Sequence, residues 1–563
     1  MSEQHHTEQP NTERDHTAPG SAQPEGAQPE GAQSGEDRVA SRRSFIKLVG
    51  VGGLATAAGC SKDTVGIGDF VPENPLLPGN TTGGTGWLPA QYNTVGNFPV
   101  QVRGRIPIDP RDPTIERLDH KCILCGQCVE VCDRYQAIMG HYELPLIDDI
   151  PCIGCGQCAL WCPTSSITER DDTAKLWDAL NNPDLHVVAQ TAPSTRIGLG
   201  EEFGLPVATN VEGKQVAALR ALGFDTVLDT NFGADMTIME EATELLQRLN
   251  VEGSSIPMFT SCCPSWVKYC EMYYPELIPH LSTARSPMGM LAPVIKTYYA
   301  DRKGIDPAKI CSVSIMPCTA KKFEMLRPEM NNAGKYLGKP EIRDTDIVIT
   351  TRELARMIKQ RNIDFLNLGD SPYDNLLSEY SGGGAIFGVT GGVMESSIRT
   401  AYYFVTGENP PPSIVDFKPV RGLDGIKEAA LEIPGFGELR VAVISGTANA
   451  KKFLDGSDRW KYENFHFVEV MACPGGCVAG GGQPKTALPP SNSVRAPRIG
   501  SLYAIDSDRP NPPAVRSCHE NPEIKRLYET FFIGGPCGEV AHKLLHGYTE
   551  HYRDRSIHFT AKR

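Results

Sequence analysis

The stretch FVEVMACPGGCVAGGGQP, residues 467–484, joins an apolar run to a loop of cysteine, glycine and proline. Two other segments share this order, because FTSCCPSW at 259–266 and MPCTAKKFE at 316–324 also sit at the ends of apolar runs. Loops that follow parallel strands gather at one edge of a sheet, where α/β folds bind their ligands. We therefore expect these loops to bring five thiols to one crevice, one more than a four-iron cluster needs.

The surrounding region alternates between apolar runs and helical patterns. The apolar runs lie at residues 186–191, 225–229, 256–260, 311–316, 346–350, 441–445 and 467–471. Helical stretches such as 239–249 and 351–361 lie between some of them. This alternation predicts an α/β domain with parallel sheets.

Two tandem cysteine runs precede this region. In such runs the fourth cysteine of each ligates the cluster of the other. We assign one [4Fe–4S] cluster to Cys122, Cys125, Cys128 and Cys162, and the other to Cys152, Cys155, Cys158 and Cys132. Zinc is the alternative for CxxC pairs, but two complete four-cysteine runs favour the clusters. Asp133 stands where the first run usually has proline, and it removes no ligand.

The length, net charge and cysteine content of the chain exclude some classes of function. The chain has 563 residues and a net charge of −13, so it is long enough for several domains and too acidic to favour nucleic acid as a partner. A disulfide framework is the other reading of its 18 cysteines. Their CxxC spacing and the adjacent pair Cys262–Cys263 favour metal ligation instead.

The N-terminal segment has the features of a targeting signal rather than of a folded domain. Residues 1–40 have a low-complexity composition that predicts disorder. SRRSFIK at 41–47 resembles the twin-arginine export signal, and the apolar run at 48–58 is shorter than the roughly 20 residues that span a bilayer. Residues 57–60, AAGC, resemble a lipobox that would be lipidated at Cys60, with ordinary signal cleavage as the alternative.

The three cysteine loops resemble the signature motifs of iron–iron hydrogenases. The likeness runs from about Cys122 to the C-terminus and includes GADMTIMEEATELLQR at 233–248, TTRELARMIK at 350–359 and AIFGVTGGVME at 385–395. It implies a two-lobed α/β catalytic domain whose parallel sheets are flanked by helices, and a small α+β ferredoxin-like domain with two [4Fe–4S] clusters. We divide the chain into disordered (1–40), signal (41–60), linker (61–112), ferredoxin-like (113–172), catalytic (173–490) and small-subunit-like (491–563) parts.

The resemblance also implies a cofactor and its ligands. The H-cluster joins a [4Fe–4S] cubane to a di-iron subcluster with CO, cyanide and azadithiolate. Its cubane ligands would be Cys263, Cys318, Cys473 and Cys477, the last bridging to the di-iron half. Lys321 would pair with one cyanide, Pro193 and Ser194 would contact the other, and Met316 and Met471 would line the di-iron pocket.

The resemblance further implies a proton relay that starts at Cys262. It would continue through Glu241, Ser282 and Glu244, with Arg248 near the exit. Glu241, Glu244 and Arg248 share one helical face, which spacing alone would interpret as a solvated surface. Three positions near the site depart from the family pattern, namely Ser265, Ala479 and Met288.

The resemblance implies that the protein catalyses reversible H2 oxidation and proton reduction. Folded export suggests H2 uptake at the cell envelope, in the periplasm or on the outer face of the cytoplasmic membrane. The partners would be a cytochrome or membrane-bound electron carrier, the twin-arginine translocase and di-iron maturation proteins. A non-catalytic cluster-assembly protein and a simple two-cluster electron carrier are the rival interpretations.

Four cysteines match no ligand pattern and are expected as buried free thiols: Cys270, Cys311, Cys518 and Cys537. A metal pair at His542 and His546 is not favoured, because no further ligand is evident nearby.

Overall fold

The computed structural model describes residues 104–138, 152–456, 461–486, 490–508 and 515–547. All of them belong to one compact unit, Gly79–Arg563. The predicted disordered segment, export signal and lipidated Cys60 lie outside the described residues, as does most of the predicted linker. None of the described helices is long and apolar enough to cross a membrane.

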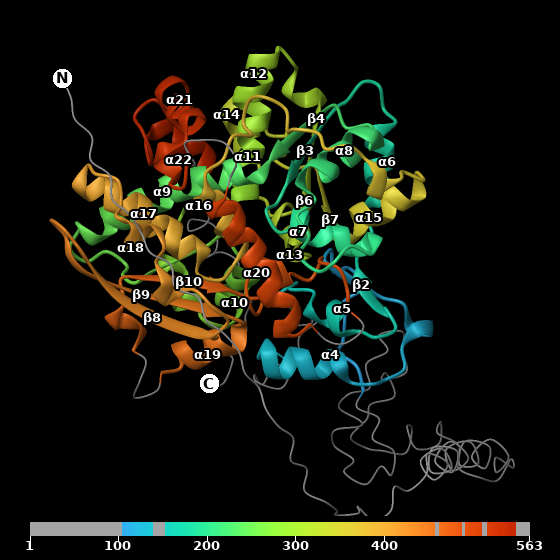
Figure 1. The fold of residues 1–563 in the computed structure, drawn as a ribbon, viewed down its shortest axis with the longest axis horizontal. Helices are drawn as coiled ribbons and strands as arrows, with labels where there is room; N and C mark the ends of the chain where they lie inside the picture. The colour runs from blue at the N-terminus through green and yellow to red at the C-terminus, as the bar shows by residue number, and fades with distance from the viewer. Residues whose placement is uncertain (1–103, 139–151, 457–460, 487–489, 509–514, 548–563) are drawn as a thin grey trace, which may run out of the picture. The chain divides into compact units, whose positions relative to one another are not determined.

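The first lobe is built on a four-stranded sheet that is parallel throughout. Its order is β4 (Thr226–Asp229), β3 (His186–Thr191), β6 (Ile310–Met316) and β7 (Ile347–Thr350). Side chains of β3 alternate between two cores, because successive strand residues point to opposite faces. Val187 packs with α8 (Glu212–Leu222) and α15 (Thr351–Gln360), whereas Val188 packs with α9 (Thr230–Leu249) and α11 (Pro287–Val294). Helices therefore cover both faces, as Figure 1 shows.

The second lobe holds a mixed sheet. Its order is β5 (Met258–Phe259), β10 (Phe467–Met471), β9 (Gly437–Ser445) and β8 (Ile426–Ile433). β5, β10 and β9 are parallel, but β8 runs antiparallel to β9. The prediction of parallel sheets is therefore wrong at this edge, where a tight hairpin with left-handed Gly435 and Gly437 reverses the chain.

The cysteine runs lie in a small α+β region. β1 (Ile115–Arg117) pairs antiparallel with β2 (Ile167–Glu169), and the short helices α4 (Gln127–Glu130) and α5 (Gln157–Trp161) follow the first cysteines of each run (Figure 1). Gly126 and Gly156 precede these helices with φ of 75° and 67°, a conformation that favours glycine. Each cysteine loop can therefore turn back on itself within three residues.

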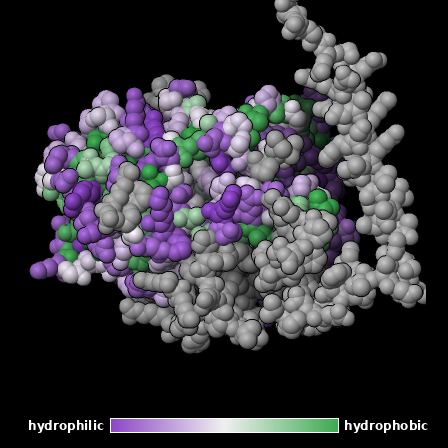
Figure 2. All heavy atoms as spheres, turned by 90° about the horizontal axis from the view of Figure 1, so that it is seen from below, coloured by the Kyte–Doolittle hydropathy of each residue, from purple (hydrophilic) through white to green (hydrophobic). Residues whose placement is uncertain are grey.

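The C-terminal segment packs against two separate hydrophobic cores of the fold. α20 (Asn492–Ser507) buries Leu502 beside Ile386, while α21 (Pro522–Thr530) and α22 (Glu539–Leu545) join the core formed by α9 and α11. The remaining α-helices are α6 (Thr173–Leu180), α7 (Thr195–Gly198), α10 (Pro264–Tyr273), α12 (Ala300–Lys303), α13 (Ala320–Glu324), α14 (Asn332–Leu337), α16 (Gly382–Ala385), α17 (Gly392–Thr406), α18 (Pro412–Val415) and α19 (Thr447–Leu454). On the face in Figure 2, hydrophobic side chains are scattered among hydrophilic ones.

Candidate active site

Four strand ends meet at one cavity between the two sheets. β3 and β6 come from the first sheet, and β5 and β10 come from the second. The cavity is lined by Ala192, Pro193, Ser194, Thr230, Ala234, Cys262, Cys263, Pro287, Met288, Met316, Pro317, Cys318, Lys321, Phe387, Gly388, Met471 and Cys477. The structure thus brings together nine residues that the sequence assigned to the H-cluster, the first proton donor included.

The four candidate ligands lie close together at this cavity. Cys263 precedes α10, Cys318 precedes α13, and Cys477 begins a 3-10 turn. Cys473 is buried beside them rather than in the cavity wall. Burial raises the pKa of Cys473, and the neighbouring Cys318, Cys155 and Cys263 thiols raise it further. Crowded, desolvated thiols of this kind are poorly ionised alone, and a metal cluster stabilises their thiolate form.

A cation and an unpaired hydroxyl face the same space. Lys321 Nζ lies 2.7 Å from Glu324 Oε2 and donates to the backbone oxygen of Cys262 at 3.3 Å. Burial lowers the pKa of Lys321, but the Glu324 carboxylate outweighs it and the net pKa is raised, so the ammonium stays charged. Ser194 is fully buried and its Oγ has no partner among the described residues. A buried anionic cofactor with hydrogen-bond acceptors fits this lining.

Glu241, Glu244 and Arg248 of the predicted relay lie together on α9, and Ser282 contacts them from a neighbouring loop. Glu241 is only 1% exposed, so the prediction from spacing alone of a solvated face is wrong. Ser282 Oγ donates to Glu244 Oε2 at 2.8 Å, and Arg248 pairs with Glu244 Oε1 at 2.7 Å. Glu241 Oε2 has no hydrogen-bond partner among the described side chains.

The two glutamates have opposite protonation tendencies. Burial and the Glu244 charge raise the pKa of Glu241 to about 8. Burial also acts to raise the pKa of Glu244, but the Arg248 charge outweighs it and the net pKa is lowered. One carboxyl therefore holds a proton near neutral pH while its neighbour is ionised, which is the arrangement that proton transfer needs.

The two cysteine runs line two separate small cavities. One is lined by Cys122, Cys125, Cys128 and Cys162. The other is lined by Cys132, Cys152, Cys155 and Cys158. The fourth cysteine of each run thus reaches into the cavity of the other, as the sequence predicted.

The second of these cavities is packed tightly against the candidate active site. Thr319, next to Cys318, donates its hydroxyl to the Gly154 backbone oxygen at 2.7 Å. A Cβ placed on Gly481 would lie 2.3 Å from the Cys155 backbone oxygen. Gln157 enters the active site from this side, a contact that the sequence did not indicate because its partners are more than 300 residues away.

The remaining thiols and histidines mostly follow expectation. Cys270, Cys311 and Cys518 are buried. Cys537 is only partly buried, so the expectation of a buried thiol is wrong there. Met288 lines the cavity, and Ser265 and Ala479 are buried close to it. His542 and His546 stack with ring centroids 5.1 Å apart.

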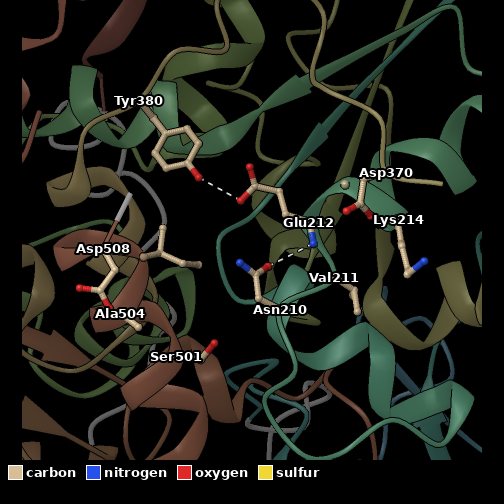
Figure 3. A pocket seen from close by; sticks show the side chains of 11 residues that line it. Asn210, Val211, Glu212, Lys214, Asp370, Tyr380, Ser501, Ala504 and Asp508 are labelled. Atoms are coloured by element: carbon tan, nitrogen blue, oxygen red, sulfur yellow. Dashed lines mark hydrogen bonds between the residues drawn. The ribbon is translucent and has the colours of Figure 1, made fainter. Parts of the chain in front are cut away.

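A wider hollow of about 590 Å³ lies elsewhere, between the start of α8 and the end of α20. As Figure 3 shows, Glu212 is its central acid and accepts from Tyr380 Oη at 2.9 Å. Arg196 also donates to Glu212, at 2.8 Å. Its lining contains no cysteine or histidine, so the cysteine-lined cavity is the better candidate for redox chemistry.

The fold and the grouped thiols define an iron–sulfur redox protein. The family described as iron only hydrogenase large subunit, C-terminal domain, matches residues 185–481, and iron hydrogenase small subunit matches 492–555. Iron hydrogenase 1 of Clostridium pasteurianum is 43% identical over 78% of this chain and 76% of its own length.

A second curated relative and a solved structure are also hydrogenases. The periplasmic [Fe] hydrogenase large subunit of Nitratidesulfovibrio vulgaris is 47% identical over 60% of this chain and 86% of its own length. A solved [FeFe]-hydrogenase HydA1 variant from Chlamydomonas reinhardtii is 39% identical over 66% of this chain and 97% of its own length, with a TM-score of 0.56. The chain belongs to the iron-only hydrogenase family, with large- and small-subunit regions fused. It is an oxidoreductase that acts on hydrogen, and its cofactor is the H-cluster.

Proposed function

We propose that this hydrogenase works as an H2-uptake enzyme at the cell envelope and passes electrons through two [4Fe–4S] clusters to a cytochrome or membrane-bound carrier. One observation carries the proposed electron path: three cysteine-lined cavities follow one another, and the middle one packs against the catalytic loops. The outer cavity lies beside Ile123, whose side chain is 62% exposed and offers an apolar contact to a partner.

We assign the cubane of the H-cluster to Cys263, Cys318, Cys473 and Cys477. When bound, the cofactor supplies the open iron at which H2 is split heterolytically. Lys321 neutralises buried negative charge at the cavity wall, and the unpartnered Ser194 Oγ provides a hydrogen-bond donor. Met316, Met471 and Pro193 keep the same space apolar and exclude water.

Protons leave the cavity through the side chains on α9. The Cys262 thiol is protonated at neutral pH, because burial and then the nearby Glu241 raise its pKa. Glu241 first passes its own proton by way of Ser282 to Glu244, which Arg248 holds at the partly exposed end, and then takes the proton of Cys262. Proton release to solvent completes the path in the uptake direction, and the same groups serve in reverse.

Location supports the direction of catalysis. The resemblance of residues 41–47 to a twin-arginine signal suggests folded export after di-iron maturation proteins have acted in the cytoplasm. The similarity to a periplasmic relative agrees with a location outside the cytoplasm. Lipidation at Cys60 would hold the enzyme at the membrane. Intact-mass analysis tests this last point, since a mature chain that starts elsewhere or lacks lipid contradicts it.

The decisive experiment is H2 oxidation with a dye acceptor, on protein matured with the di-iron cofactor. Three cubanes and a di-iron unit predict about 14 iron atoms per chain. Infrared bands of bound CO and cyanide should accompany activity. An active enzyme with only about six iron atoms would retain the hydrogenase chemistry but contradict the two additional clusters.

A further inference from the structure

Glu240, Cys537 and His546 meet where the C-terminal segment packs against α9. Their carboxylate oxygen, sulfur and imidazole nitrogen all lie within 4.8 Å of one another. His546 Nε2 is 2.9 Å from Glu240 Oε2, and Cys537 Sγ is 3.5 Å from the Glu240 backbone oxygen. Glu240 and His546 are buried, whereas Cys537 remains partly exposed. Three different metal-ligand types therefore share one partly open position.

Two of the three donors, His546 and Glu240, are oriented by further groups. Thr283 Oγ1 lies 2.8 Å from His546 Nδ1, and its hydroxyl can either donate or accept. When it accepts from Nδ1–H, the Nε2 lone pair is free to bind a cation. Tyr528 donates to Glu240 Oε1, and the Cys537 backbone N–H donates to Glu240 Oε2 at 2.6 Å. Outer partners of this kind typically accompany histidine and carboxylate ligands of metals.

The backbone at Cys537 adds an independent observation. Its φ is 57°, in the left-handed region that favours glycine. The hydrogen bond to the Glu240 carboxylate uses only the backbone N–H, which a glycine would also provide, whereas the contact with the Glu240 backbone oxygen needs the thiol. The structure thus holds a side chain in a strained conformation, and strain of this kind clusters at functional sites.

We propose that Glu240, Cys537 and His546 bind a divalent cation of the zinc class, with a fourth position open to solvent. One thiolate, one imidazole and one carboxylate form a common ligand set for zinc. Binding releases the proton of the Cys537 thiol and frees His546 Nε2 from its hydrogen bond to Glu240. The site joins the small-subunit-like segment to the helix that carries Glu241 and Glu244, and it does not depend on the direction of H2 chemistry.

The test titrates zinc sulfate into chelator-treated holoenzyme, and measures zinc per chain and the zinc K-edge X-ray absorption spectrum. We expect about one zinc per chain, with one sulfur at about 2.3 Å and the other ligands at about 2.0–2.2 Å. Cys537→Gly suits the left-handed backbone, so it removes the thiol without adding strain. Cys537→Gly and His546→Gln should each weaken zinc binding at least about 10-fold, and Thr283→Val should weaken it about 10–100-fold.

His542→Gln is the matched control, because His542 lies on α22, which ends just before His546, is exposed, and touches the donor set only by stacking on the His546 ring. It should leave zinc affinity unchanged. The proposal is overturned if His546→Gln and His542→Gln bind zinc equally well, or if the spectrum shows a shell of four sulfurs, which would place zinc at the cluster cysteines. Failure to bind zinc at micromolar concentration would also overturn it.

Discussion

Gln157 Nε2 lies 3.3 Å from Cys473 Sγ and donates to the Ala479 backbone oxygen at 2.8 Å. Gln157 stands between Cys155 and Cys158 in the second cysteine run, and Cys473 belongs to the catalytic loop after β10. The buried Gln157 amide lies in the loop that we propose to ligate the neighbouring cluster. It therefore contacts a proposed ligand of the catalytic cubane directly.

Replacing this amide should lower the reduction potential of the catalytic cubane. An N–H donor stabilises the more negative, reduced cluster, and hydrogen bonds to sulfur are one of the levers that set its potential. A hydrogen bond of about 1 kcal/mol corresponds to roughly 40 mV for one electron, so Gln157→Leu should shift the potential down by that order. A redox titration followed by electron paramagnetic resonance measures it.

Gln127 provides the matched control, because it occupies the same place in the first cysteine run. Gln127→Leu should leave the catalytic cubane unchanged. Equal potentials in the Gln157→Leu and native enzymes would show that the contact has no electronic role.

Loss of Glu244 should stop proton traffic without disturbing the clusters. Glu244 is the only carboxylate in the described structure that accepts from both Ser282 Oγ and Arg248. Glu244→Ala should cut turnover by about 10²–10⁴-fold, the usual range for a positioned acid–base group, with unchanged iron content. Glu252→Ala, at an exposed glutamate beyond the same helix, serves as control. Near-native turnover in Glu244→Ala would refute the relay.

Glu241 should carry its proton at neutral pH and lose it near pH 8. Burial and the Glu244 charge raise its pKa to about 8, so the acid is protonated below that pH and ionised above it. Infrared difference spectra should show a protonated carboxyl band that disappears as pH rises through 8 and is absent in Glu241→Gln. Glu244→Gln removes a neighbouring negative charge, so it should move the midpoint to lower pH. A band that persists unchanged in Glu241→Gln would assign the proton to another group.

Paired cysteine variants test whether the fourth cysteine of each run ligates the cluster of the other run. Cys122→Ser and Cys162→Ser should perturb the same cluster and give matching paramagnetic spectra, because both cysteines line one cavity. Cys152→Ser and Cys132→Ser should form the second matching pair. If Cys162→Ser matched Cys152→Ser instead, each run would ligate its own cluster.

The sequence predicted the parts of this molecule that depend on local order. Apolar runs placed β3, β6 and β10 because buried parallel strands are nearly continuous in hydrophobicity. The antiparallel β8 was missed, since its residues mix exposed and buried positions and lie outside the apolar runs. Cysteine spacing predicted which thiols share a cavity, because one tight loop can supply only three corners of a cluster.

Contacts between distant segments could not be predicted in the same way. The burial of Glu241 depends on the second sheet and on Ser282, and nothing in the spacing of α9 distinguishes a buried acidic face from a solvated one. The approach of His546 and Cys537 to Glu240 joins residues about 300 positions apart. Such contacts are set by how completed elements pack, which no local pattern encodes.

The glycine at position 481 has a consequence for the speed of the enzyme. With a Cβ it would collide with the Cys155 backbone oxygen, so only glycine lets the two loops approach this closely. Electron tunnelling weakens steeply with separation, and a larger side chain here would widen the gap that each electron crosses. Under the proposed cluster assignment, Gly481→Ala should therefore push the two loops apart and slow electron transfer between the neighbouring cluster and the catalytic cubane.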